Sequence, residues 1–182
     1  KGKNFRNFCG QPLFRWILDT LLAVAEIDQI VINTDARHIL AQNGLTDTSR
    51  IIIRDRKPEI CGDHVSMNDV LFDDVNSVPS DIYVMTHVTN PLLSSATLRT
   101  ALHAFRQGLE ESTKDSLFSV NRHQTRFYSA DCKPINHDLS NLIPTQELEP
   151  WFEENTCLYI FTTSSFLSTG ARIGRCPIMY EL

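Results

Sequence analysis

Four short segments of this sequence combine side chains that bind phosphate, hydroxyl and amide groups. Each follows a run of apolar residues, and they occupy positions 33–35, 54–59, 86–91 and 121–123. In an open α/β sheet, ligands bind outside the carboxyl ends of the strands, where such connecting segments meet. We therefore expect a functional site among these four segments.

The second segment is strongly basic within an otherwise acidic chain. Arg54, Arg56 and Lys57 place three positive charges within four residues. Guanidinium and ammonium groups bind phosphate oxygens through charge-assisted hydrogen bonds, so a phosphorylated ligand is one interpretation. The alternative is a solvated loop in which these cations pair with Asp55 and Glu59, and surface pairs of this kind contribute little stability.

The other segments also have two interpretations. Residues 86–90 offer hydroxyl and amide groups to a pocket, but they also fit a plain connection to a helix capped by Ser94 or Ser95. Asp35 has the chemistry to hold a metal or a ribose hydroxyl, although we favour a role as N-cap of the helix that follows. No glycine-rich dinucleotide motif, P-loop, hydrolase nucleophile motif or zinc spacing occurs.

Composition and charge restrict the class of protein. The 182 residues are 42% apolar and 21% charged, which is typical of a folded globular chain. Lys and Arg number 17 against 22 Asp and Glu, and the net charge of −5 argues against a nucleic-acid partner. No apolar stretch approaches the roughly 20 residues that cross a bilayer, so we expect no membrane contact. Five cysteines without C-x-x-C spacing favour reduced thiols and a cytoplasmic location.

The elements that must position these side chains alternate along the first 120 residues. The spacing of apolar residues predicts helices at 12–25, 36–42, 65–75 and 97–109, and strands at 30–32, 51–53, 82–85 and 117–120. The run at 51–53 contains no polar residue, which favours parallel strands covered on both faces. The pattern predicts a layered α/β protein with a mainly parallel sheet.

The pattern changes after residue 121. A polar, proline-containing stretch at 131–150 precedes another strand-like run at 157–161, and a short helix at 164–168 and a strand at 178–180 follow. A loop of roughly 20 residues inside a compact domain usually serves a function or makes an interface. We therefore predict a protruding arm over residues 122–156.

Taken as an ordered set, short motifs resemble the acylneuraminate cytidylyltransferase family, whose members make CMP-sialic acid and related CMP-activated sugars. The matching motifs are KN (3–4) with CGQPL (9–13), IVINTD (30–35), RKPEICGD (56–63) with VS (65–66), HVTNPL (87–92), DSLFSV (115–120), QEL (146–148) and ENTCLYIF (154–161). The resemblance implies a Rossmann-like, three-layer α/β/α nucleotidyltransferase fold with a protruding arm. It also implies a single cytidylyltransferase domain over 1–182, truncated at both ends.

The resemblance further implies a reaction and its residues. The anomeric hydroxyl of a sialic-acid-like nonulosonic acid would attack the α-phosphorus of CTP and displace pyrophosphate, with Mg²⁺ bridging phosphate oxygens. Carried over residue by residue, the nucleotide contacts are Lys3, Asn4, Arg56, Ser66, Thr89 and Asn90, the catalytic residues are Lys3 and Arg56, and the sugar contacts are His87, Gln146 and Asn155. The arm is expected to carry Gln146 into the partner of a homodimer.

This chain also departs from the family pattern. The basic phosphate loop and the strand before it are expected ahead of Lys3, and the metal ligands are expected beyond residue 182. His87 stands where the family has Gln, and Leu93 and Thr145 stand where Arg is common, so the acceptor side carries less positive charge. Two alternatives therefore remain open. One is a transferase for a shorter ulosonic acid, and the other is a non-catalytic nucleotide-binding module.

Overall fold

The computed structural model describes residues 2–182, and its helices and strands alternate as the sequence predicts. The strands are β1 (Asn7–Phe8), β2 (Gln11–Pro12), β3 (Ile30–Thr34), β4 (Ile51–Asp55), β5 (Ile82–Thr86), β6 (Ser116–His123), β7 (Trp151–Thr162) and β8 (Pro177–Glu181). The α-helices are α1 (Leu13–Leu22), α2 (Arg37–Gln42), α3 (Met67–Ser77), α4 (Ser95–Glu110) and α5 (Thr163–Thr169). Three short 3-10 helices are η1 (Lys3–Phe5), η2 (Pro58–Ile60) and η3 (Thr145–Glu147).

The strands form three separate sheets rather than one mainly parallel sheet. β3 and β4 pair in parallel, and β1 and β2 form a small antiparallel ladder. The third sheet has the order β5-β7-β6-β8, in which β7 runs antiparallel to both of its neighbours while β6 and β8 are parallel. The prediction of a mainly parallel sheet is therefore wrong. The physical reason is that β6 returns into β7 through a long hairpin, which makes the two strands antiparallel.

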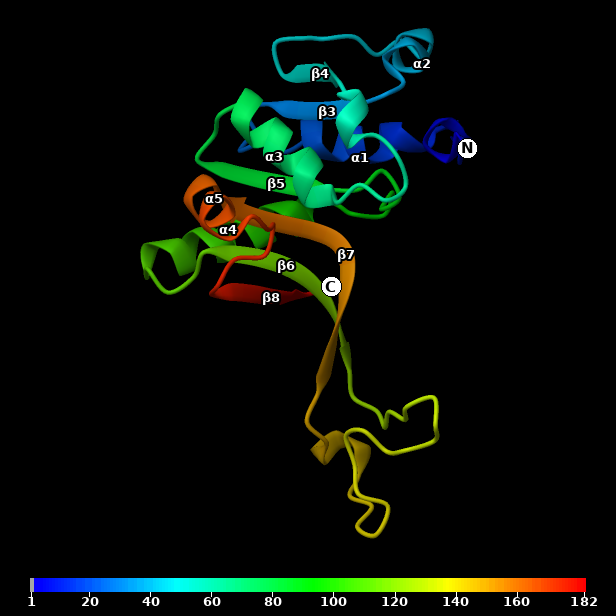
Figure 1. The fold of residues 1–182 in the computed structure, drawn as a ribbon, viewed down its shortest axis with the longest axis vertical. Coiled ribbons are helices and arrows are strands. Elements are labelled where there is room, and N and C mark those ends of the chain that lie inside the picture. The colour runs from blue at the N-terminus through cyan, green and yellow to red at the C-terminus, as the bar shows by residue number, and fades with distance from the viewer. Residues whose placement is uncertain (1) are drawn as a thin grey trace.

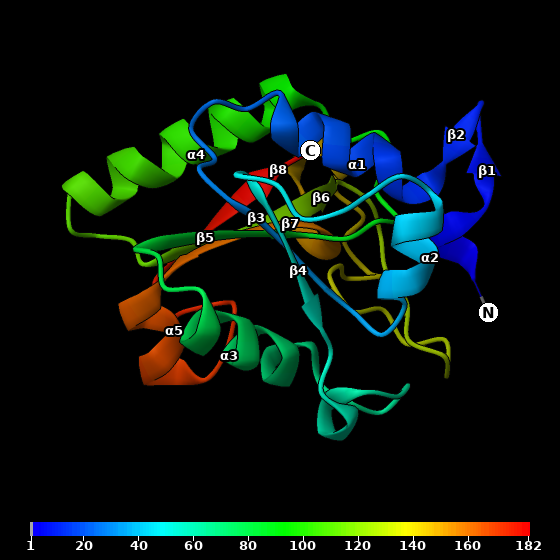
Figure 2. The ribbon, with the colours of Figure 1, turned by 90° about the horizontal axis from the view of Figure 1, so that it is seen from above.

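Helices cover both faces of the sheets, which gives the expected three layers. Figure 2 shows α1 and α4 on one side of the strands and α3 and α5 on the other. Leu98, Ala101 and Phe105 of α4 pack with Leu117 and Ile160 in one apolar cluster. Further clusters join α1 to the β3–β4 pair and α3 and α5 to β5 and β7. No helix within residues 2–182 is both long and apolar enough to span a bilayer, and all five cysteines are free thiols.

Helix α1 shows how the sequence positions the core. Pro12 presets a φ of −57° just ahead of the helix, and Phe14, Ile17 and Leu18 are buried at helical spacing. Phe14 and Leu18 face the cluster beneath β3 and β4, whereas Ile17 belongs to the cluster shared with α4. Helix α1 therefore bridges the two halves of the molecule.

A long hairpin projects from the body. β6 and β7 continue beyond the sheet as a two-stranded stem that ends where His123 pairs with Trp151, and residues 124–150 form its tip (Figure 1). Arg126 donates to the carbonyl of Ile143 at 2.6 Å, and the rings of Phe127 and Trp151 stack with centroids 5.5 Å apart. These contacts give the tip an internal structure although it has no regular sheet.

Candidate functional site

A cavity of about 830 Å³ separates β3 from β5 and runs along the full length of both strands. Five of the residues predicted for the site line this cavity: Lys3, Asn4, Arg56, His87 and Thr89. They lie on η1 and on the segments that follow β4 and β5. The structure therefore gathers five of the nine carried-over residues at the carboxyl ends of the strands, where an α/β fold binds its ligands.

A relay of hydrogen bonds orients Arg56 at this rim. Asp74 accepts a hydrogen bond from the Asn33 Nδ2 at 2.8 Å, which turns Oδ1 of Asn33 toward Arg56. Nε of Arg56 donates to that oxygen at 2.9 Å, and Nη2 donates to the Asn33 carbonyl at 2.8 Å. These bonds use two of the five N–H donors of the guanidinium, so the remaining three are free to bind an anion.

The other two cations of the basic segment, Arg54 and Lys57, pair with acidic residues of α3. Arg54 bonds Asp74 and lies 2.8 Å from Asp73, and the Lys57 Nζ lies 2.5 Å from the same Asp73. The hydrogen bond from Lys57 lowers the pKa of Asp73, and Arg54 lowers it further, whereas burial raises the pKa of Asp74. Arg54 and Lys57 thus do not pair with Asp55 and Glu59 as in a solvated loop. They are also not free to bind phosphate together with Arg56. Only Arg56 of the three cations lines the cavity.

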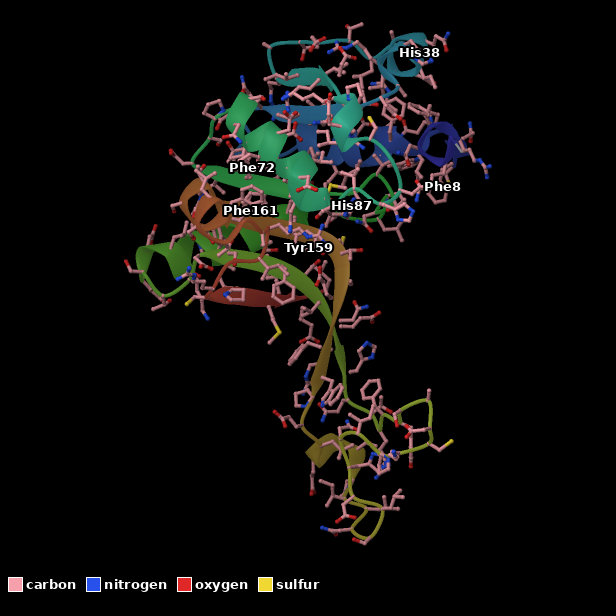
Figure 3. All side chains as sticks on the ribbon, viewed as in Figure 1. Phe8, His38, Phe72, His87, Tyr159 and Phe161 are labelled. Atoms are coloured by element: carbon pink, nitrogen blue, oxygen red, sulfur yellow. The ribbon has the colours of Figure 1, made fainter. Side chains whose placement is uncertain are left out.

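His87 follows β5 directly and is half-buried at the rim (Figure 3). Desolvation on burial lowers the pKa of His87 below its ordinary value, and the positive charges of Arg172 and Lys3 lower it further. The imidazole is therefore neutral near pH 7 and presents one donor and one acceptor nitrogen. A bound anion at the same rim would raise this pKa again.

Asn4 carries an unpartnered polar atom at the cavity wall. The Oδ1 of Asn4 is fully buried and has no hydrogen-bond partner in the described structure. A buried acceptor without a donor is costly, and such groups in folded proteins usually mark a bound water or ligand. The adjacent Lys3 is exposed on η1 and contributes positive charge at the same place.

Ser66 lies in a smaller pocket of about 250 Å³ beside the main cavity, and Met67 lines both. Its hydroxyl caps α3 by accepting from the Asn68 N–H at 3.2 Å. The same pocket contains Arg172 and Glu154, which sequence reasoning did not single out.

Arg172 is held by two contacts. Its guanidinium lies 4.0 Å from the ring centroid of Tyr159, and its Nη2 lies 3.3 Å from Oε1 of Glu154. Tyr159 also donates a hydrogen bond to Glu154, and burial raises the pKa of this tyrosine. No sequence signal marked Arg172, because its partners are 13 or more residues away and belong to another element. Figure 3 shows Tyr159 and His87 on the side of the body near the turn of β7 toward the arm.

Asn155 and Asn90 hold the backbone of β7 instead of lining the cavity. The pairing of β6 with β7 is irregular between Phe118 and Val120, and Thr156 adopts a φ of 56° opposite this point. Asn155 accepts from the Ser119 Oγ at 2.5 Å and from the Cys157 N–H at 3.1 Å, and it donates to Asn121 at 3.0 Å. Asn90 donates to the Thr156 carbonyl at 3.2 Å. Both amides are therefore bound within the protein.

Gln146 and Asp35 lie away from the cavity rim. Gln146 sits in η3 on the exposed arm, so a single chain does not bring it to its own cavity (Figure 1).

The expectation that Asp35 caps α2 is wrong. The N-cap of α2 is Ala36, without a side-chain cap, because Thr34 accepts the Ala36 N–H at 3.0 Å. Ser94 caps α4 as one interpretation predicted, by accepting the Thr97 N–H at 3.0 Å.

The described residues do not form a metal site. Within residues 2–182, no group of three His, Cys, Asp or Glu side chains converges as metal ligands would. Asp73 and Asp74, the acidic pair nearest the rim, are engaged by Arg54 and Lys57. These two carboxylates are therefore not available to a Mg²⁺ ion, and no step below is assigned to one.

Comparisons with known proteins identify the family and the fold. The family profile described as cytidylyltransferase matches residues 1–172. No curated protein sequence matches significantly. The fold resembles a 4-diphosphocytidyl-2C-methyl-D-erythritol synthase from Anaerococcus prevotii, with 13% identity and a TM-score of 0.64 over 90% of this chain and 65% of that one.

Two further solved structures are similar. One is a CMP:2-keto-3-deoxy-manno-octonic acid synthetase complexed with CTP, with 14% identity and a TM-score of 0.60 over 88% of this chain and 67% of that one. The other is a cytidylyltransferase from Leptospira borgpetersenii, with 16% identity and a TM-score of 0.55 over 92% and 56%. This chain therefore spans about two thirds of their length or less. At these identities the structures show an α/β nucleotidyltransferase fold, and the profile match shows that the chain belongs to the cytidylyltransferase family.

Proposed function

We propose that this protein transfers CMP from CTP to the anomeric hydroxyl of a sialic-acid-like nonulosonic acid and releases pyrophosphate. The observation that carries the proposal is the set of groups at the cavity rim. Lys3 and Arg56 supply positive charge, and the buried Oδ1 of Asn4 is an acceptor without a hydrogen-bond donor among the described residues. Family membership supports CTP as the nucleotide.

The rim offers complementary groups to each part of CTP. The three free N–H donors of Arg56 and the ammonium of Lys3 neutralise phosphate oxygens. Oδ1 of Asn4 accepts a hydrogen bond from a ribose hydroxyl or from the cytosine amino group, both of which are donors. Thr89 provides a hydroxyl at the same rim. Because nucleotidyl transfer depends on positioning and charge neutralisation, these groups can act without a covalent intermediate.

For the acceptor sugar, His87 is the best-placed of the three residues that the resemblance suggests. Its neutral imidazole lies at the rim and can hydrogen-bond the acceptor hydroxyls. Asn155 acts through the backbone of β7, because its amide is fully bonded within the protein. We propose that it positions the strand beside the acceptor and does not touch the sugar.

We also propose that the protein is a homodimer in which the arm delivers Gln146 to the partner's cavity. The arm exposes large apolar side chains, which are Tyr128, Ile135, Leu139, Leu142, Trp151 and Phe152. An apolar surface of this kind on a projecting segment favours burial against another chain. Sedimentation of the L139D/L142D variant should show a shift toward monomer. A wild-type monomer at micromolar concentration would contradict the dimer.

A panel of reactions tests the proposed activity. The protein is mixed with each of four nucleoside triphosphates and with nonulosonic and shorter ulosonic acids in Mg²⁺ buffer, and pyrophosphate release is measured. We expect turnover only with CTP and a nonulosonic acid. Turnover with the shorter acid alone would establish the alternative acceptor. CTP binding without turnover in any mixture would establish a non-catalytic module and refute the enzyme.

A further inference from the structure

Among the described residues that line the rim of the main cavity, His87 is the one group that can accept a proton near pH 7. Lys3 and Arg56 are cations, and the hydroxyl of Thr89 is a very weak base. Asp74 lies on α3 and already accepts hydrogen bonds from two side chains. The other carboxylates of the cavity wall precede β3 or β5 and so lie at the opposite ends of those strands; they are Glu26, Asp28 and Asp81.

The fold itself does not use the imidazole of His87. Neither ring nitrogen makes a hydrogen bond to any described residue, whereas the ring of His123 bonds Glu153. The His87 ring is half-buried (Figure 3), yet neither nitrogen is among the fully buried polar atoms that lack a partner. Both nitrogens are therefore accessible, and the ring lines the main cavity. A ring in this state is available to a ligand.

The backbone that carries His87 is fixed on both sides. Oγ1 of Thr86 donates to the Cys157 carbonyl at 2.8 Å, which ties the end of β5 to β7. The N–H of Asn90 donates to the His87 carbonyl at 3.0 Å, and the Asn90 side chain donates to the Thr156 carbonyl at 3.2 Å. The imidazole therefore projects from a tight turn held against β7. Fixed placement of this kind is what a group must have to meet a reacting hydroxyl.

The charges around His87 keep its imidazole unprotonated before reaction. Burial lowers the pKa of His87, and the positive charges of Arg172, after α5, and of Lys3, in η1, lower it further. Glu154 of β7 lies 3.3 Å from Arg172 and partly offsets that charge. A general base must be unprotonated at the start of the reaction. The phosphates of bound CTP would then favour the protonated ring, because a nearby anion stabilises an imidazolium.

We propose that His87 is the general base of the transfer, an inference that rests on the proposed function. The anomeric oxygen attacks the α-phosphorus of CTP, and its proton passes to the unprotonated nitrogen of His87. As the new O–P bond forms, the bond from the α-phosphorus to the pyrophosphate oxygen breaks, and that oxygen keeps the electron pair. Pyrophosphate leaves beside Lys3 and Arg56, and the imidazolium then releases its proton to water. The glutamine of the family pattern can bind a hydroxyl, but it cannot take its proton.

The pH dependence of pyrophosphate release, compared between the wild type and H87Q, tests the proposal. Glutamine keeps a donor and an acceptor for the sugar but accepts no proton. We expect kcat of H87Q to fall about 100-fold near pH 7, with the KM for the sugar acid changed less than about threefold. The wild type should lose kcat/KM as pH falls below about 6.5. In H87Q this acid limb should vanish, and the rate should rise steadily with pH as hydroxide replaces the base.

A rescue experiment and a matched control accompany this comparison. H87A vacates the position of the base, and added imidazole should raise its rate about tenfold or more at neutral pH. H103Q makes the same exchange at an exposed residue of α4 outside the cavity lining, and it should keep the wild-type rate and pH profile. Melting temperatures of all variants are measured alongside the rates, and CTP binding is measured by calorimetry.

Three results would overturn the proposal. A wild-type pH profile in H87Q would show that another group takes the proton. A raised KM in H87Q at unchanged kcat would make His87 a binding contact only. A wild-type protein that binds CTP but releases no pyrophosphate with any acceptor would refute the proposed function, and the assignment of a base would fall with it.

Discussion

Replacing Arg56 with alanine tests the phosphate-binding role of the rim. Two of the guanidinium N–H donors bind Asn33, at 2.9 and 2.8 Å, which fixes the side chain and directs the other donors at the cavity. A hydrogen bond to a charged group contributes about 1.5–3 kcal/mol, so R56A should weaken CTP binding about 10- to 150-fold. N33A keeps the cation and loses its orientation, and the expected loss is about fivefold.

Calorimetric titration with CTP measures both variants, and K57A is the matched control. Lys57 is the next residue and carries the same charge, but it is exposed, bonds Asp73 and lies outside the cavity lining. K57A should bind CTP within about twofold of the wild type, as expected for a screened surface charge. R56A with wild-type affinity, or an equal loss in K57A, would refute the assignment of Arg56 to a specific phosphate contact.

Three further predictions concern stability and pH. Thr156 is β-branched at a φ of 56°, so T156G should raise the free energy of unfolding in urea by about 1 kcal/mol, and a decrease would show that the turn is unstrained. N155A removes three hydrogen bonds and should lower that free energy by about 3 kcal/mol, whereas an unchanged value would restore a ligand-facing role for Asn155. The pKa of His87 is lower in the folded protein, so the unfolded chain binds its proton first and the wild type should lose stability as pH falls below about 6.5. Melting temperatures measured against pH should fall less in acid for H87Q than for the wild type. An equal fall in both proteins would contradict the burial of His87.

The sequence predicted most elements because their signals are local. The β-branched run at 30–32 and the helical spacing of Phe14, Ile17 and Leu18 each specify an element without reference to the rest of the chain. The direction of β7 was not predictable in the same way. It depends on whether residues 124–150 form a hairpin or a crossover, and both are compatible with a long polar loop.

The site was predictable only in part. Residues that follow a strand, such as Arg56 and His87, could be placed at the rim from the order of elements alone. The relay from Asp74 through Asn33 joins positions 41 residues apart, and the contact of Arg172 with Glu154 joins positions 18 apart. Such contacts are set by tertiary packing and leave no spacing pattern in the sequence.

In the proposed function, CTP binds at the rim formed by η1 and the residues after β4 and β5. Amide hydrogen exchange of the protein with and without CTP tests it directly, with GTP as the matched control. We predict slower exchange in the peptides that cover residues 3–5, 55–57 and 86–90 with CTP, and little change with GTP. Unchanged exchange in those peptides at saturating CTP, or the same protection with GTP, would contradict the account.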